Sequence, residues 1–250
     1  MNQQCGIQTA THVSNKLALI NMNIISNQYW IGSGIFSDYG LDCLQSRFQW
    51  PKNDLNSYNK TVELKHRLQI QWQQSSKQEK LNIATEVIKD WGGIKGNKQT
   101  TIEKYTDIDI HSSQFPFKGV ASYSKVLGIV DPLKFAILDA RVIVSLNAIQ
   151  LLSNTDSGVY FPYLSGRNKI TGDNTNKRGF SQIEIFKRNS PIFKNWIKPK
   201  RDDVYQIYLN ALKTEARKLN EPLYKLEMAL FADAEKLALQ CAEKFNVHLT

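Results

Sequence analysis

One segment of the chain, residues 140–152, is apolar on nearly every side when it is wound into a helix. Its apolar side chains are Val142, Ile143, Val144, Leu146, Ala148, Ile149, Leu151 and Leu152. A helix at a protein surface has one apolar stripe, whereas a helix that is apolar all round is buried among other elements. The segment therefore predicts a central helix, from Ala140 to about Leu152, around which the rest of the fold packs.

A second helix is predicted just before the central one. Its apolar positions recur at the three-and-four spacing of a helix with one apolar face: Val120, Tyr123, Val126, Leu127 and Val130. Lys125 falls on the opposite side of this helix, so we expect it to face away from the core. The helix should end at Val130, because Pro132 disfavours the helical conformation at Asp131 and has no backbone N–H.

Asp139 stands at the head of the predicted central helix. A carboxylate at this position accepts backbone N–H bonds and lies at the positive end of the helix, and both effects favour its ionised form. One interpretation is an ordinary N-cap, which contributes ~1 kcal/mol to stability. The other is a functional carboxylate that stabilises a developing positive charge or helps to deprotonate an attacking group. The lysine-bearing helix before Asp139 and the basic segment after it favour the second interpretation.

The basic charge is concentrated in residues 165–201. This segment carries ten of the 32 basic residues and two acidic ones, and so accounts for +8 of the net charge of +9: Arg167, Lys169, Lys177, Arg178, Lys187, Arg188, Lys194, Lys198, Lys200 and Arg201. Concentrated basic charge beside glycine, asparagine and tyrosine residues suits a polyphosphate backbone. The alternative is a solubilising surface loop.

The order of these features resembles that of a known family. Lys118-Gly119-Val120, the helix that bears Lys125, and Leu138-Asp139-Ala140-Arg141-Val142 resemble the hairpin, helix and capping aspartate of the helix-hairpin-helix DNA glycosylases, most of all the 8-oxoguanine glycosylase-like branch. Residues 208–234 look like the closing helices of the same branch.

The resemblance implies a function and a set of site residues. Asp139 would be catalytic, and Lys125 would be either an amine nucleophile that confers AP-lyase activity or an exposed lysine that contacts phosphate. The partner would be double-stranded DNA with an extruded base, either an 8-oxoguanine-like lesion or a modified base of phage DNA, and no cofactor is implied. With the basic segment added, the expected DNA contacts are Lys118, Gly119, Ser122, Arg141, Arg167, Lys169, Lys177 and Arg178. The expected base-pocket aromatics are Trp91, which precedes a glycine turn, and Tyr163, which lies near Arg167 in the sequence. Two rival functions stay open: a non-catalytic helical DNA-binding subunit and a helical scaffold for protein partners.

Other functional classes lack their sequence signals. Cys5, Cys43 and Cys241 have no CxxC spacing, which argues against a disulfide framework, a zinc ribbon and the cluster-bearing glycosylase branch. The four histidines form no HxxxH or HxE pattern, so no metal-dependent reaction is expected. No apolar run is long enough to span a bilayer. The expected location is cytoplasmic, in association with the nucleoid.

The remaining patterns predict an all-α fold with a long irregular basic segment. Further helices are expected at residues 16–27, 61–72, 77–91, 203–219 and 221–245, with a helical turn at 40–48. Gly92-Gly93 should end the third of these helices. Residues 153–199 should be irregular, with one short helix at 181–188, and residues 102–105 are ambiguous. The chain, residues 1–250, is predicted to be one domain, or two lobes (1–117 and 118–250) with a cleft between them.

Overall fold

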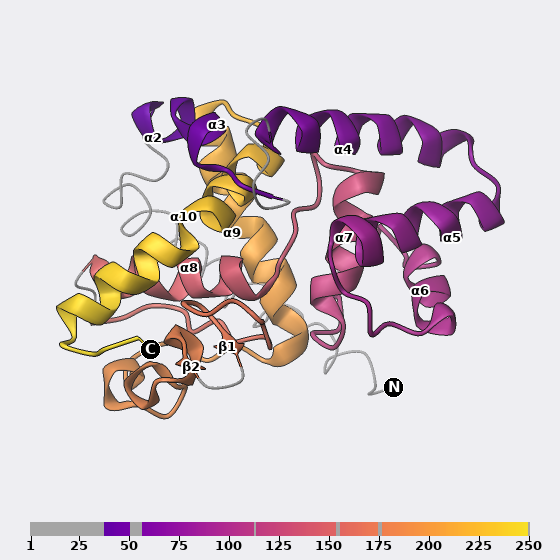
Figure 1. The fold of residues 1–250 in the computed structure, drawn as a ribbon. Coiled ribbons are helices and arrows are strands. Elements are labelled where there is room, and N and C mark those ends of the chain that lie inside the picture. The colour runs from indigo at the N-terminus through magenta and orange to yellow at the C-terminus, as the bar shows by residue number, and fades with distance from the viewer. Residues whose placement is uncertain (1–37, 51–56, 113, 154–155, 175–176, 250) are drawn as a thin grey trace, which may run out of the picture.

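The computed structural model describes residues 38–50, 57–112, 114–153, 156–174 and 177–249. Over these residues the fold is predominantly helical (Figure 1), as predicted. The helix expected at residues 16–27 lies outside the described residues. Among the described helices, none has both the length and the apolar character needed to cross a bilayer.

The predicted central helix is confirmed as α8, Ala140–Leu152. It packs along α10, Leu223–Lys244, and Ser145 Oγ on α8 donates a hydrogen bond of 2.6 Å to the Leu230 carbonyl on α10. The neighbouring helix α9, Val204–Leu219, fixes the segment that leads into α8. The hydroxyls of Tyr205 and Tyr208 donate to the carbonyls of Ala136 and Ile137, at 2.8 and 2.9 Å. These buried bonds fix the position of Asp139 at the head of the central helix.

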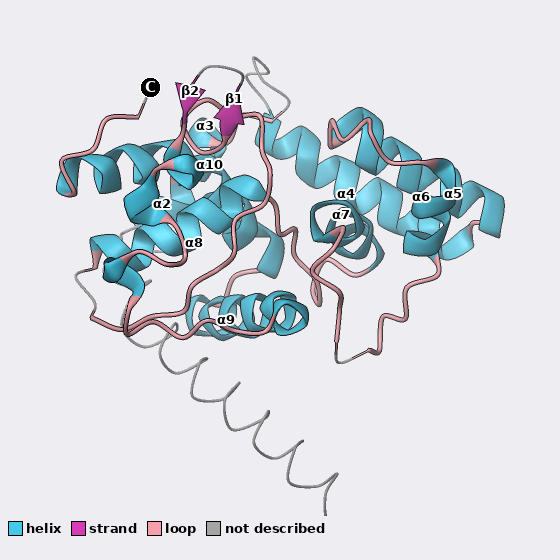
Figure 2. Cartoon of the chain, turned by 90° about the horizontal axis from the view of Figure 1, so that it is seen from below, coloured by secondary structure: helices cyan, strands magenta, loops and turns pink. Residues whose placement is uncertain are grey.

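Helix α7, Val120–Val130, ends where the proline predicted. One of its faces, with Tyr123 and Leu127, belongs to the hydrophobic cluster of α8, α9 and α10. The other, with Val126 and Ile129, belongs to a second cluster. Figure 2 looks nearly along α7 and shows helices on both sides of it. The helix therefore has two buried faces, whereas its sequence pattern predicts one.

The second cluster consists mainly of helices from the first half of the chain. They are α4, Ser57–Gln74; α5, Lys77–Thr85; a π-helical turn, η2, Glu86–Trp91; and α6, Gln99–Thr106. The predicted helix at 77–91 thus changes into a π-helical turn in its second half, and the ambiguous residues 102–105 lie within α6. Because α7 contributes to both clusters, the clusters do not divide the chain at residue 118, and the two-lobe division stays a prediction.

In the described residues before α4 there are two short helices. They are α2, Asp38–Asp42, and α3, Leu44–Arg47, at the predicted helical turn. Arg47 reaches α10, where its guanidinium makes two hydrogen bonds, 3.1 and 3.0 Å long, to the buried Asp233 carboxylate. This ion pair anchors the chain that leads towards Trp50.

Residues 153–199 contain no α-helix in their described part. They contain two antiparallel strands of two residues each, β1 Asp173–Asn174 and β2 Lys177–Arg178. They also contain the 3-10 turns η3 Phe180–Gln182, η4 Glu184–Phe186 and η5 Pro191–Phe193. A further 3-10 turn, η6 Arg201–Asp203, leads into α9. The single helix expected at 181–188 is therefore wrong, because η3 and η4 turn Phe180 and Phe186 onto each other, with ring centroids 4.0 Å apart.

The irregular segment is nevertheless tied to the core. Asn147 on α8 makes two hydrogen bonds to the backbone of Phe161, and Gln150 bonds the backbone of Val159 in the same way. Paired side-chain amides satisfy backbone groups that would otherwise be buried without partners. These bonds hold the chain just before the basic segment against α8.

Candidate active site

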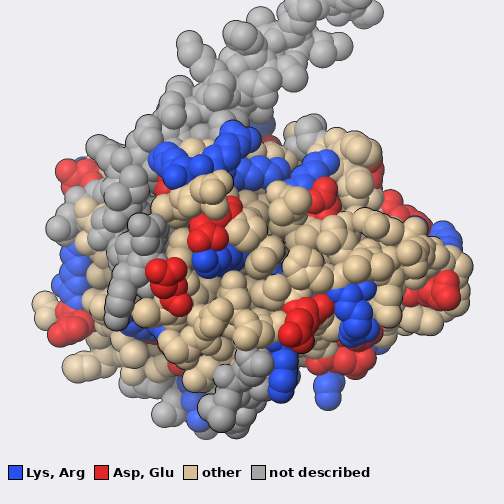
Figure 3. Space-filling view, turned by 90° about the horizontal axis from the view of Figure 1, so that it is seen from above, with Lys and Arg blue, Asp and Glu red and all other residues tan. Residues whose placement is uncertain are grey.

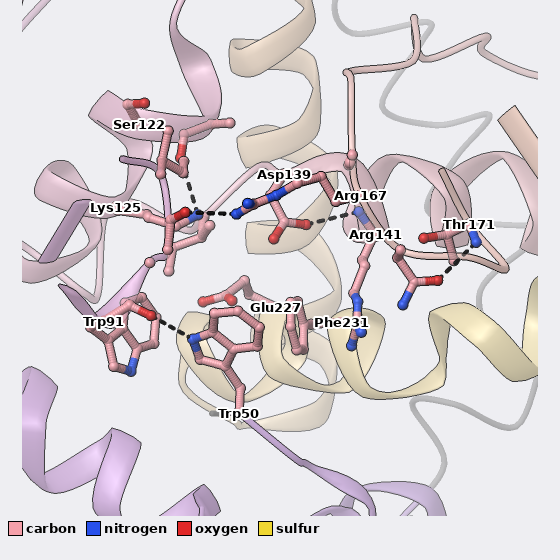
Figure 4. Close-up of a pocket in the computed structure, with 18 of the residues that line it drawn as sticks. Trp50, Trp91, Ser122, Lys125, Asp139, Arg141, Arg167, Thr171, Glu227 and Phe231 are labelled. Atoms are coloured by element: carbon pink, nitrogen blue, oxygen red, sulfur yellow. Dashed lines mark hydrogen bonds between the residues drawn. The ribbon is translucent and has the colours of Figure 1, made fainter. Parts of the chain in front are cut away.

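A cavity of about 640 Å³ lies where the two hydrophobic clusters meet. Its walls come from α4, the turn after η2, α7, the head of α8, residues 165–171 and α10. Figure 4 shows Lys125 and Asp139 on one wall, with Trp50, Glu227 and Phe231 facing them. The cavity therefore brings together segments that are far apart in the sequence.

The structure corrects the predicted orientation of Lys125. Its side chain is buried, with the residue only 5% exposed, and it lines the cavity. The physical reason is that helices α4 to α6 cover the side of α7 that the apolar pattern left free. Nζ donates to the Ala121 carbonyl at 3.0 Å. Burial lowers the pKa of the Lys125 ammonium, while the negative charges of Asp139 and Glu227 partly oppose this shift.

Asp139 caps α8 as the sequence predicted. Its Oδ1 accepts hydrogen bonds from the backbone N–H groups of Arg141 and Val142, at 3.0 and 3.1 Å. Among the described residues, no hydrogen bond is made to its Oδ2. One oxygen thus fixes the carboxylate to the helix, and the other is available to a group in the cavity.

Aromatic rings form another part of the cavity lining. The rings of Trp50 and Phe231 meet edge to face at 5.8 Å, and Trp50 Nε1 donates to the Trp91 carbonyl at 2.9 Å. Trp91 lines the cavity, as expected for a base-pocket aromatic. Trp50 was missed because no local motif marks it, and Phe231 was missed as well. A signal for Phe231 was present: it lies one turn after Glu227, an acidic residue in an otherwise apolar stretch of its helix.

Three of the residues predicted to contact DNA also line the cavity. Ser122 is buried, and its hydroxyl accepts a 2.7 Å hydrogen bond from Asn97. Arg141 lies over the Phe231 ring at 4.7 Å and pairs with Glu235 at 3.0 Å.

The third of these residues, Arg167, is exposed, and its guanidinium donates to the Gly93 carbonyl at 2.9 Å. This bond joins residues 165–171 to the turn after η2. The two opposite sides of the cavity are therefore connected at Arg167.

The other predicted contacts are not among the residues that line the cavity. Lys118, Lys169 and Arg178 are exposed, whereas the side chain of Lys177 lies outside the described residues. Gly119 adopts a left-handed conformation, with φ of 85°, at the N-terminus of α7. A side chain at this position would clash with the Tyr105 hydroxyl, so glycine is required here.

Tyr163, the second predicted base-pocket residue, is not in the cavity. Its ring packs edge to face on Tyr160 and Phe180, at 5.8 and 6.2 Å. The Tyr163 ring is thus part of an aromatic cluster with Tyr160 and Phe180. The cavity instead receives Trp50 and Phe231.

A buried ion pair lines the cavity opposite Asp139. Lys65 on α4 and Glu227 on α10 are 2.8 Å apart, and each side chain is 5% exposed. Burial raises the pKa of Glu227, and Lys65 partly offsets this shift. The pair was missed because it joins residues 162 positions apart, and nothing local distinguishes Lys65 from other helix lysines.

Gly92 allows Lys125 to lie against the turn after η2. A Cβ at this position would lie 2.7 to 2.8 Å from the carbonyl oxygens of Val87 and Ile88 and 2.8 Å from Lys125 Cδ. We expect Gly92→Ala to lower the free energy of unfolding by about 1–3 kcal/mol, as overpacking usually does. Denaturant unfolding measures this loss. Gly96→Ala is the matched control, because Gly96 also lines the cavity but a Cβ added there would have no atom within 4 Å. Equal stability of the two variants would contradict the proposed contact.

No protein-family profile, curated protein or solved structure matches this chain. Within the described ranges, no group of three histidine, cysteine or acidic side chains is placed to hold a metal ion.

Proposed function

We propose that the protein is a DNA glycosylase that excises a damaged or modified base, with Lys125 as the amine nucleophile and Asp139 as the catalytic carboxylate. The observation that carries this proposal is the shared cavity, in which a buried lysine and an N-cap carboxylate with one unbonded oxygen line the same aromatic-walled space. Such a pair suits the cleavage of a bond at a carbon that becomes positively charged.

The proposed reaction begins with attack of the Lys125 amine on the sugar C1′. The bond between C1′ and the base breaks, and the base leaves with the bonding electrons and takes up a proton. The Asp139 carboxylate stabilises the positive charge that develops on the sugar. Loss of a proton from the new C–N linkage and opening of the sugar ring then give a Schiff base between Lys125 and C1′. Elimination of the 3′ phosphate from this Schiff base cleaves the strand, which is the proposed AP-lyase step.

The aromatic lining supports an extruded base as the ligand. A base inside duplex DNA is out of reach of a buried amine, so an enzyme of this kind must hold its target outside the stack. The rings of Trp50, Trp91 and Phe231 offer stacking surfaces, which contribute about 1–3 kcal/mol per base in other proteins. The target is a damaged base such as 8-oxoguanine or a modified base of phage DNA, and the proposal covers both.

Exposed cations close to the cavity support DNA as the partner. Lys95 and Arg167 are exposed and line the cavity, and Lys169 follows in the basic segment. The N-terminus of α7 at Gly119 has the helix polarity that favours a phosphate. Seen from above, Lys and Arg side chains gather along one edge of the face in Figure 3, while acidic and basic residues are mixed over the rest.

We expect Lys169→Glu to weaken binding to all DNA sequences and to reduce the slope of log K against log salt by about 1, the effect of one lost phosphate contact. Titration of a fluorescent duplex at several salt concentrations measures both quantities. Lys104→Glu on α6 is the control, since Lys104 is also exposed but lies outside the basic segment. The same salt slope in both variants would mean that Lys169 only contributes to solubility.

The decisive test of the function is release of free base. The protein is incubated with phage DNA and with duplexes that each carry one lesion, and the products are separated by chromatography. Base release from at least one substrate is expected. Salt-dependent DNA binding without any base release would instead favour a non-catalytic DNA-binding subunit, and the absence of DNA binding would favour a scaffold for protein partners.

A further inference from the structure

The Lys65–Glu227 ion pair has no role in the reaction described above, yet both residues line the reaction cavity. Two buried lysines, Lys65 and Lys125, thus share one cavity with two carboxylates, Asp139 and Glu227. An ammonium group is costly to bury unless a partner compensates for the lost water. The contacts of each buried lysine therefore decide how well its charge is compensated.

The contacts of the two lysines differ. Lys65 Nζ lies 2.8 Å from a Glu227 oxygen, a charge-assisted bond of the strongest kind in proteins. Lys125 Nζ donates to a neutral backbone carbonyl, and within the described residues it has no hydrogen bond to either carboxylate. Charge is therefore compensated directly at Lys65 and only from a distance at Lys125.

The charges around Lys125 also affect its pKa. Burial lowers the pKa of Lys125 most, Asp139 and Glu227 raise it, and the positive charge of Lys65 lowers it. These three charged groups come from three elements that line the cavity together with α7: Lys65 from α4, Asp139 from the head of α8 and Glu227 from α10. The remaining charged groups of the cavity lining are Lys95, Arg141 and Arg167.

We propose that Lys65 is a positioning residue that keeps Lys125 in its free-amine form. The Lys65 ammonium is bonded to the Glu227 carboxylate, which would otherwise stabilise the charged form of Lys125. It also places a fixed positive charge in the same cavity. A second cation beside a buried lysine is a known way to activate an amine. The role in catalysis rests on the proposed function, whereas the protonation of Lys125 does not.

The protonation of Lys125 can be measured without DNA. Brief acetylation with acetic anhydride over a pH series, followed by peptide mass spectrometry, gives the titration midpoint of each lysine. In the unmodified protein we expect Lys125 to become reactive at lower pH than both Lys65 and the exposed Lys118, which is an internal reference. A Lys65 midpoint at or below that of Lys125 would overturn the proposal, and this measurement needs no variant.

Substitutions then test the direction of the effect. Lys65→Gln keeps a donor for Glu227 but removes the charge, so it should raise the Lys125 midpoint by about one pH unit or more, since Glu227 then favours the Lys125 ammonium. Lys65→Arg keeps the charge and should behave like the wild type. The double variant K65Q/E227Q removes the competing carboxylate as well and should restore the low midpoint. An unchanged midpoint in Lys65→Gln would show that Lys65 is merely structural.

A second readout links this inference to the reaction. Borohydride trapping of a protein–DNA adduct at neutral pH should fall in Lys65→Gln, by up to about tenfold, because a shift of one pH unit changes the amine fraction by at most about tenfold. Trapping in Lys65→Arg and K65Q/E227Q should stay near that of the wild type. Shifted acetylation midpoints in a protein that releases no base from any DNA would support the activation of Lys125 and refute the glycosylase.

Discussion

Lys125→Gln is expected to abolish the covalent protein–DNA adduct that borohydride traps during turnover. Only an amine forms a reducible Schiff base with the opened sugar, and glutamine keeps a polar end without an amine. Base release should fall at least ~100-fold, the scale on which positioned reactive groups usually act. Gel electrophoresis of borohydride-treated reactions with labelled DNA measures the adduct.

Folding and DNA binding provide the controls for this variant. Within the described part of the chain the buried Lys125 ammonium makes one hydrogen bond, to the Ala121 carbonyl, so a neutral amide should not reduce the stability much. Lys104→Gln removes an exposed lysine on α6 to which no role is assigned and should leave the adduct intact. Adduct formation at the wild-type level in folded Lys125→Gln would mean that another amine attacks. Base release by the wild type without any adduct would indicate water as the nucleophile.

The backbone of the site could be predicted from the sequence because its signals are local. Pro132 ended α7 at Val130, the continuous apolar pattern identified α8, and an acidic residue before an apolar run indicated the N-cap at Asp139. Gly119 was also a local signal, because its left-handed conformation is one that residues with a side chain rarely adopt. Each of these features depends on neighbouring residues, so periodicity and capping rules apply to it.

The composition of the cavity could not be predicted because it depends on contacts between distant segments. The predicted exposure of Lys125 was wrong. The sequence pattern of α7 shows one apolar face, but in the fold the opposite face is covered by α4 to α6. Trp50, Lys65 and Glu227 enter the cavity through packing between helices, and no residue near them in the sequence marks that packing. Tyr163 illustrates the converse case, because the aromatic cluster of the basic segment holds its ring outside the cavity.

Asp139→Asn is expected to reduce base excision at least ~100-fold while changing the stability little. Asparagine caps a helix about as well as aspartate, so the bonds to the Arg141 and Val142 N–H groups can be kept. What is lost is the negative charge beside the sugar, which is the group proposed to stabilise its transition state. Single-turnover base release and thermal unfolding measure the two effects.

Asp131→Asn is the matched control for the loss of one capping carboxylate. Asp131 Oδ1 accepts from the backbone N–H groups of Leu133 and Lys134, in the way that Asp139 accepts from its own helix, but Asp131 does not line the reaction cavity. The two variants should therefore lose similar, small amounts of stability, and only Asp139→Asn should lose excision. Because removal of the Asp139 charge also withdraws a group that raises the pKa of Lys125, the amine fraction should increase in this variant. A loss of excision despite a larger amine fraction would show that the carboxylate acts on the sugar, whereas unchanged excision by the folded variant would leave Asp139 with the role of a helix cap.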